Sequence, residues 1–211
     1  MAKYIFILKG LVKHLLFRLS KSEFREYHNF PFDYNKTPLP KKAADVMAAC
    51  CGILEGLGIR YRLTDGTILG LYRQGDFIPH DDDIDIDILD YAQVECLHEM
   101  MKSFSMKLGR KVIYKQKVQQ MVYYNSDKIV VDLVFWHSEG ATVFNYCERG
   151  CRRSQEKRFF ESMPQLEYRG RKFPMPSQIE EWLGMRYGPD WRIPKTYKGD
   201  WKAECGDIER L

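Results

Sequence analysis

Apolar residues recur at helical spacing through the start of the chain, and this pattern predicts an amphipathic helix over residues 1–28. Every basic residue of positions 1–25 falls on the side opposite to the apolar stripe. Two interpretations are open: the stripe packs on the rest of the protein, or it lies on an anionic membrane surface. The stripe consists of Tyr4, Ile5, Leu8, Leu11, Val12, Leu15, Leu16 and Leu19.

Three prolines between residues 29 and 40 predict a linker or an extended arm, because proline cannot donate a backbone hydrogen bond. Helical spacing returns over residues 41–57 and stops at Gly58, where a short strand and a turn follow. We therefore divide the chain into an N-terminal helix at 1–28, a linker at 29–40 and a folded domain at 41–211.

Six aspartates fall within residues 81–90, and part of this run alternates strictly with isoleucine. A period of two predicts a strand with one apolar face and one acidic face. Like charges on one face repel, so a fold retains them where solvent or a cation neutralises them. The alternating residues are Asp83, Ile84, Asp85, Ile86, Asp87 and Ile88.

Carboxylate oxygens held on a rigid strand are suitable ligands for Mg²⁺ or Mn²⁺. A calcium-binding EF-hand loop is the alternative, since Asp81, Asp83 and Asp85 have its first three spacings. However, Ile86 stands where that loop needs glycine, and Ala92 stands where it needs glutamate. We predict a divalent catalytic metal site rather than a calcium loop or a purely structural acidic face.

Asp132 is the candidate for a further metal-binding carboxylate, because it interrupts an apolar run over residues 129–135. A single acid in so apolar a run is costly unless a partner neutralises it. The alternative is a strand residue that faces solvent.

The remaining pattern predicts a mixed α+β fold. Strands are predicted at 111–116, 119–125 and 129–136, and a later helix is predicted to begin at a Ser177–Glu180 capping box and to end at Gly188.

The composition is that of one soluble globular domain: 211 residues, 45% hydrophobic and 29% charged. Residues 1–25 hold six basic side chains and one acid, whereas the net charge of the whole chain is only +4. The body is therefore nearly neutral, and we expect no nucleic-acid partner. Six cysteines without a C-x-x-C pair indicate reduced thiols and a cytoplasmic protein.

Two segments resemble the LicD family, which is related to the fukutins and belongs to the nucleotidyltransferase-fold superfamily. The first is TDGTILGLYRQGDFIPHDDDIDIDI, and the second is PMPSQIEEWLGMRYGPDW. With Asp132 between them, they extend the resemblance over about residues 41–194. His80 departs from the family pattern, in which tryptophan is common at this position.

The resemblance implies a nucleotidyltransferase-like mixed sheet flanked by helices, with the predicted amphipathic helix in front of it. It also implies transfer of a substituted phosphate, such as phosphocholine or a polyol phosphate, from a CDP-linked donor to a hydroxyl. The acceptor would be a cell-surface glycan or its lipid-linked precursor, and CMP would leave. Divalent ions would relieve the repulsion between the diphosphate and the attacking oxygen.

The resemblance and the chemistry together assign roles to individual residues. Asp83 and Asp85 are the expected metal ligands, Asp81 is an auxiliary ligand, and Asp132 completes the site and accepts the proton of the hydroxyl. The expected substrate-binding residues are Asp65, Gly66, Thr67 and Arg73. Gly66 alone could serve only the turn, and Arg73 could be an ordinary surface ion-pair partner.

Two other functions fit the same residues. One is a nucleotidyltransferase that attaches NMP to a small molecule or protein and releases pyrophosphate. The other is a non-catalytic, membrane-associated binding protein with a vestigial acidic strand. In each case we expect a cytoplasmic protein, held at the inner face of the membrane if residues 1–25 bind lipid.

Overall fold

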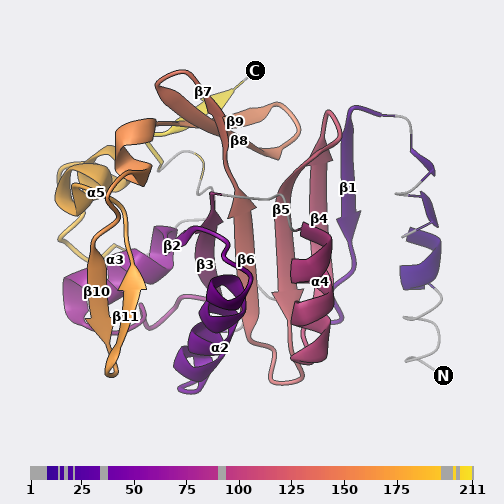
Figure 1. The fold of residues 1–211 in the computed structure, drawn as a ribbon, viewed down its shortest axis with the longest axis horizontal. Coiled ribbons are helices and arrows are strands. Elements are labelled where there is room, and N and C mark those ends of the chain that lie inside the picture. The colour runs from indigo at the N-terminus through magenta and orange to yellow at the C-terminus, as the bar shows by residue number, and fades with distance from the viewer. Residues whose placement is uncertain are drawn as a thin grey trace.

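A six-stranded mixed sheet forms the centre of the computed structural model (Figure 1). β3 and β6 are parallel neighbours, whereas the other adjacent strands pair antiparallel. The strands lie in the order β1 (Phe24–His28), β4 (Lys107–Tyr114), β5 (Lys117–Tyr124), β6 (Val130–Phe135), β3 (Asp83–Ile88) and β2 (Tyr61–Leu63). The structure describes residues 9–13, 15–16, 19–20, 22–33, 38–89, 94–195, 202 and 205–210.

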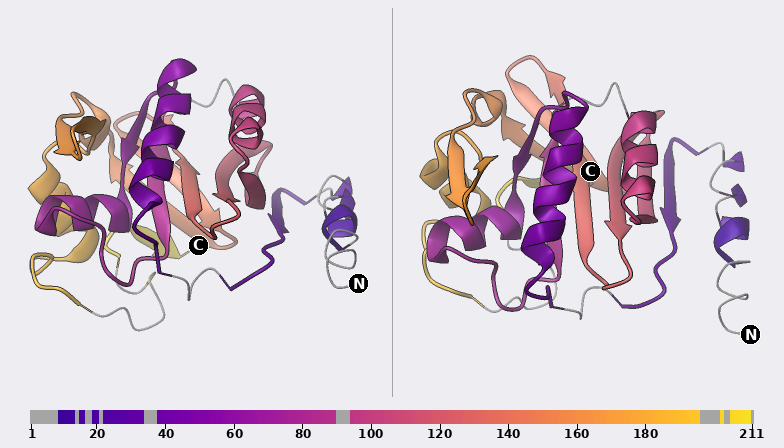
Figure 2. Two further views of the ribbon diagram at one scale, coloured as in Figure 1. Left: turned by 90° about the horizontal axis from the view of Figure 1, so that it is seen from below. Right: turned by 60° about the horizontal axis from the view of Figure 1, so that its bottom comes forward.

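Two helices, α2 (Ala43–Gly56) and α4 (Val94–Ser103), cover one face of the large sheet (Figures 1 and 2). Ile84, Ile86 and Ile88 of β3 are fully buried in the core that α2 completes. Because side chains alternate along a strand, the aspartates of β3 lie on the opposite face. The predicted strand with one apolar and one acidic face is therefore confirmed, as is the mixed α+β fold class.

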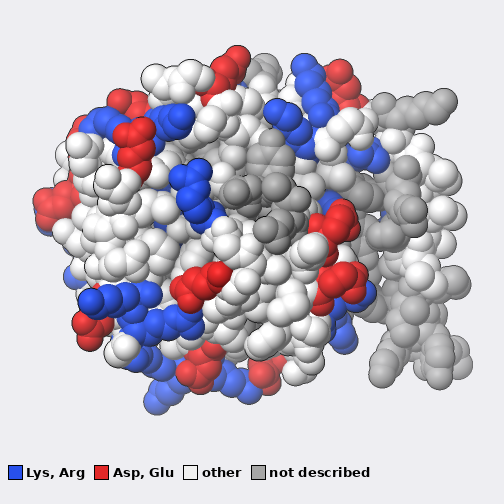
Figure 3. Space-filling model, viewed as in Figure 1, with Lys and Arg blue, Asp and Glu red and all other residues white. Residues whose placement is uncertain are grey.

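The remaining elements lie at the ends of the central strands and beside β2 (Figure 1). A smaller sheet has the order β12 (Ile208–Arg210), β9 (Cys151–Glu156), β8 (Thr142–Glu148) and β7 (His137–Glu139). On the β2 side lie α3 (Asp65–Gln74), α5 (Ile179–Tyr187), the 3₁₀ helix η2 (Lys157–Phe160) and the hairpin of β10 (Gln165–Tyr168) and β11 (Arg171–Pro174) (Figure 1). On the face that carries α2 and α4, acidic and basic side chains are intermixed (Figure 3).

The predicted helix over residues 1–28 is wrong at its end, because residues 24–28 form the edge strand β1. Glu26 of β1 pairs with Val112 of β4, and Arg110 donates a hydrogen bond to Glu26 at 2.7 Å. The aromatic and alternating sequence FREYH suits a half-exposed strand, and the edge of β4 supplies the hydrogen bonds that a lone segment lacks.

The described part of residues 29–40 packs on the domain, which fits the predicted extended arm rather than a free linker. Asn29 donates its backbone N–H to Gly109 at 2.7 Å, and Leu39 donates to Asp81 at 2.8 Å. The Phe30 ring lies against Gly109, where a Cβ would come within 2.4 Å of it. The true domain therefore begins at β1 rather than at residue 41.

The rest of the predicted N-terminal helix lies partly outside the described residues. Positions 9–13, 15–16 and 19 are helical, but Tyr4, Ile5 and Leu8 are not described. The described residues of the apolar stripe are exposed, from 50% for Val12 to 68% for Leu19. An amphipathic helix over the whole segment stays a prediction.

Two local details differ from the sequence interpretation. The β4–β5 turn lies at Lys115 and Gln116, which both have positive φ although neither is a usual turn residue. The predicted capping box at Ser177 is wrong: α5 begins after Gln178, and no side chain caps it. The predicted helix end at Gly188 is confirmed.

Candidate active site

Three aspartate carboxylates converge where β3 and β6 run side by side. The parallel register places Asp85 directly opposite Asp132, and Asp83 lies two residues earlier on β3. One oxygen atom from each of these three carboxylates lies within 4.8 Å of the others. The structure thus brings together the three carboxylates that the sequence indicated, and we call them the metal centre.

Burial makes the charged forms of these carboxylates costly. It raises the pKa of Asp83 and of Asp85 well above the usual value, and the neighbouring aspartates raise both further. Burial also raises the pKa of Asp132 to about 7, although Arg110 and a hydrogen bond from Gln120 oppose this shift. Such a site is destabilised by its own charge unless a cation enters.

The donor set of the metal centre fits a hard divalent cation. Asp132 accepts a hydrogen bond from the Gln120 amide through Oδ2, while its buried Oδ1 has no partner among the described residues. All three ligands are carboxylates on adjacent rigid strands, which is the chemistry that Mg²⁺ and Mn²⁺ prefer. The metal itself stays a prediction.

Asp81 and Asp82 continue the acidic region in front of β3. One oxygen each from Asp81, Asp82 and Asp83 forms a second group within 4.8 Å. Burial raises the pKa of Asp81 to about 7 and that of Asp82 to about 6. The buried Oδ2 of Asp81 lacks a partner within the described chain. Asp81 therefore borders the metal centre through Asp83, and its role as an auxiliary ligand stays a prediction.

The N-terminus of α3 lies against this acidic group. A Cβ on Gly66 would come within 2.8 Å of the Asp81 carboxylate, so glycine is needed for this close approach. The backbone N–H of Asp85 donates to the Thr67 hydroxyl at 2.9 Å, and the Thr67 N–H points back to Asp85 Oδ2 at 3.4 Å. Thr67 thus fixes α3 to β3.

The first residue of α3, Asp65, is the centre of a buried ion-pair network. Arg153 of β9 donates to both oxygens of Asp65 at 2.9 and 3.0 Å, and Arg186 of α5 donates at 2.7 Å. Asp207 accepts hydrogen bonds from the same two arginines at 3.1 and 2.6 Å. Although burial opposes it, these arginines hold the pKa of Asp65 well below its usual value. The Asp65 carboxylate therefore orients α3.

A second buried ion pair involves Asp87, which lies two residues beyond Asp85 on β3. Arg62 of β2 binds Asp87 at 2.8 Å, and both side chains are fully buried. The Trp136 indole also donates to Asp87 at 2.6 Å. Asp87 shares the acidic face with the metal centre but is neutralised by arginine.

The sequence interpretation did not identify this arginine network. Arg153 lies on strand β9 and is only 3% exposed. The burial of residues alternates along β9, but CRRSQE has no matching alternation of apolar residues, so the sequence carries no signal that places Arg153 inside.

Arg73 lies at the C-terminal end of α3, six residues beyond Thr67, which is about 9 Å along a helix. It donates to the Trp191 carbonyl at 3.3 Å and to Gln74 at 3.3 Å. The structure places it against the loop after α5, so its contact with substrate stays a prediction. Trp182 and Trp191 are core residues.

Family comparison agrees with this geometry. The model for the LicD/FKTN/FKRP nucleotidyltransferase domain matches residues 58–178, which is more than half of the chain and includes the whole metal centre. The chain belongs to this family. The resemblance seen in the sequence motifs is therefore confirmed.

Relatives of this LicD-family chain include human ribitol-5-phosphate transferase FKTN, 26% identical over 80% of the chain and 37% of the relative. Human ribitol 5-phosphate transferase FKRP is 27% identical over 65% of the chain and 29% of the relative. The chain thus spans about a third of the length of these proteins. Among solved structures, the lincomycin-bound lincosamide adenylyltransferase LnuA has a TM-score of 0.49 at 15% identity, covering 70% of this chain and 86% of its own.

The raised pKa values predict an opposite response to pH with and without metal. A carboxyl group whose folded pKa is near 7 and whose unfolded pKa is about 3.9 stabilises the fold fully below pH 4, and this contribution is lost as pH rises to 7. In EDTA, thermal melts should therefore show Tm falling between pH 5 and 8. With Mn²⁺, the metal-induced rise in Tm should be larger at pH 8 than at pH 5.

The variants Asp83→Asn, Asp85→Asn and Asp132→Asn should fold, melt with a flatter pH profile in EDTA and gain less from Mn²⁺. The matched control is Asp190→Asn, which removes an exposed carboxylate that pairs with Lys195. Equal Mn²⁺-induced shifts in the wild type and all three variants would show that these carboxylates do not bind the metal.

The buried network predicts a large loss of stability when one arginine is removed. Arg186→Met leaves Asp65 and Asp207 each with one fewer partner, and breaking a buried ion pair costs about 3–5 kcal/mol. Urea denaturation measures this difference. Arg158→Met, which removes an exposed arginine beside Glu181, is the control and should change stability little. A loss no larger than that of the control would contradict the structural role of the network.

Proposed function

We propose that this domain is a metal-dependent phosphotransferase that moves a substituted phosphate from a CDP-linked donor to a glycan hydroxyl and releases CMP. The observation that carries the proposal is the convergence of buried Asp85 with half-buried Asp83 and Asp132, in a group with an unpartnered, buried oxygen. The names of the FKTN and FKRP relatives support ribitol 5-phosphate or a similar polyol phosphate as the transferred group. The acceptor in this proposal is a cell-surface glycan or its lipid-linked precursor.

A divalent ion held by the metal centre would neutralise diphosphate charge and orient the donor. The chain's own residues have three tasks around it. Asp83 and Asp85 hold the ion from β3, while Asp132 holds it from β6 and accepts the proton of the attacking hydroxyl. Thr67 and the Asp65 network fix the N-terminus of α3 beside these ligands, where backbone N–H groups favour phosphate oxygens.

Product analysis tests the reaction. Incubation with Mn²⁺, CDP-ribitol or CDP-choline and a candidate glycan should release CMP, and Asp132→Asn should lower the rate at least about tenfold to a hundredfold. The control Asp190→Asn should retain the wild-type rate. CMP release by Asp132→Asn at the wild-type rate under saturating Mn²⁺ would contradict the proposed role of Asp132. Pyrophosphate release from a nucleoside triphosphate, without CMP release, would favour the nucleotidyltransferase alternative.

We also propose that the N-terminal segment holds the protein at the anionic inner face of a membrane. The opposite side of this segment faces the domain, since the Lys13 amino group donates to the His28 carbonyl at 2.9 Å. Leu11, Leu15 and Leu16 are 64%, 56% and 63% exposed, which favours the membrane over packing in the core. Within the described residues, no helix is long and apolar enough to cross a membrane.

Liposome flotation tests this placement. Leu15→Glu combined with Leu16→Glu should abolish binding to anionic vesicles at low salt while leaving Tm unchanged, because the two side chains are exposed. Ile193→Glu is the matched control, as Ile193 is equally exposed at 62% on another surface. The proposal would be contradicted if the double variant had a lower Tm than the wild type, or if it bound vesicles as well as the wild type does.

A further inference from the structure

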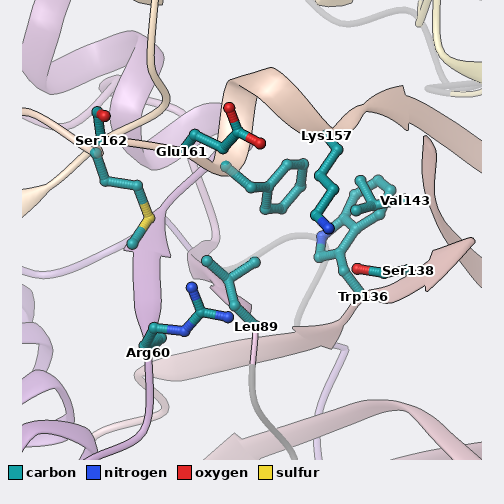
Figure 4. A pocket seen from close by; sticks show the side chains of 10 residues that line it. Arg60, Leu89, Trp136, Ser138, Val143, Lys157, Glu161 and Ser162 are labelled. Carbon is teal, nitrogen blue, oxygen red and sulfur yellow. The ribbon is translucent and has the colours of Figure 1, made fainter. Parts of the chain in front are cut away.

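A separate cavity lies at the opposite end of β3 from the metal centre (Figure 4). Its volume is about 330 Å³, and Leu89, the residue after β3, contributes to its wall. Leu89 is four residues beyond Asp85, which corresponds to about 13 Å along a strand. The buried Arg62–Asp87 pair stands between the two sites, because Arg62 stacks on one cavity residue and Asp87 accepts a hydrogen bond from another.

Two cationic side chains enter this cavity. Arg60 and Lys157 approach it from opposite sides (Figure 4), and within the described part of the chain neither forms an ion pair. Nearby Arg62 and Arg158, by contrast, both bind carboxylates. Glu161 is the one acidic side chain among the described residues that line the cavity, so this described lining has a net positive charge. This arrangement favours an anionic group between the two cations.

The floor of the cavity is apolar and rigid. The rings of Trp136 and Phe160 lie 5.3 Å apart, and both are buried. Leu89 and Val143 extend this surface, and the Ser138 hydroxyl lies at its border. The carbon-bound hydrogens of a sugar ring or polyol chain pack favourably on such a floor. The volume is at the lower end of the range of ligand pockets, which favours one small unit over a nucleotide sugar.

We propose that this cavity binds one phosphorylated sugar or polyol unit. Arg60 and Lys157 hold the phosphate, while the carbon skeleton rests on Trp136 and Phe160. The site would give the protein a second point of contact with an anionic carbohydrate, separate from the carboxylates of the metal centre. The proposal is independent of the catalytic assignment, because it rests on different residues at the other end of β3.

Calorimetric titration of the full chain in EDTA tests the site with glucose 6-phosphate, inorganic phosphate and glucose. Glucose 6-phosphate should bind more tightly than either of the other two, since it alone offers both the charge and the ring. Arg60→Gln combined with Lys157→Gln should weaken its binding at least about tenfold. The control variant, Lys107→Gln combined with Lys172→Gln, loses the same charge at two exposed lysines and should bind normally.

Two further comparisons between variants distinguish the possible results. Asp83→Asn should bind glucose 6-phosphate as wild type does, whereas loss of binding in this variant would place the ligand at the metal centre and overturn the proposal. Equal weakening in the two double variants would show non-specific charge attraction and overturn it as well. Equal affinity for inorganic phosphate and glucose 6-phosphate would show that the apolar floor of Trp136 and Phe160 does not contribute to binding. Thermal melts confirm that each variant is folded.

Discussion

The electrostatic repulsion among buried and half-buried aspartates is the constraint on which this structure depends. β3 carries three of them on one face, and the parallel neighbour β6 adds Asp132 beside Asp85. Each ionised carboxylate in such a position costs free energy unless an opposite charge lies close to it. The protein meets this cost in two different ways along a few residues of one strand.

Arginine neutralises one part of the acidic face. Arg62 binds Asp87 of this face, and Arg153 and Arg186 bind Asp65 of the neighbouring helix α3. These ion pairs hold both carboxylates in fixed positions. Asp83, Asp85 and Asp132 form no ion pair with an arginine within the described chain, and burial raises the pKa of each, although the charge of Arg110 lowers that of Asp132. Burial raises the pKa of Asp87 as well, but there the paired Arg62 opposes the shift. The difference explains why acids of the same strand have different roles: those with arginine partners support the framework, and those without them favour a cation.

The sequence predicted the carboxylates because their evidence is local. Alternation along β3 is visible in six residues, and Asp132 stands out within an apolar run. The arginine network was not predictable in this way, since Arg153 and Arg186 are 88 and 121 positions away from Asp65. The β4–β5 turn was misplaced for a related reason, because Lys115 and Gln116 adopt positive φ without the glycine or asparagine that normally signals it.

Long-range contacts also bring segments from before and after the family motif to the site. Asp207, which precedes β12, completes the network that holds α3, and a Cβ on Gly206 would come within 2.1 Å of the Met185 carbonyl of α5. At the other end, Leu39 donates to the Asp81 carbonyl and so fixes the backbone just before β3. The geometry of the metal centre therefore depends on segments outside the motif that contains its ligands. A fragment limited to the family match at 58–178 would lack Arg186 and Asp207, and would leave Asp65 with a single arginine partner in a buried site.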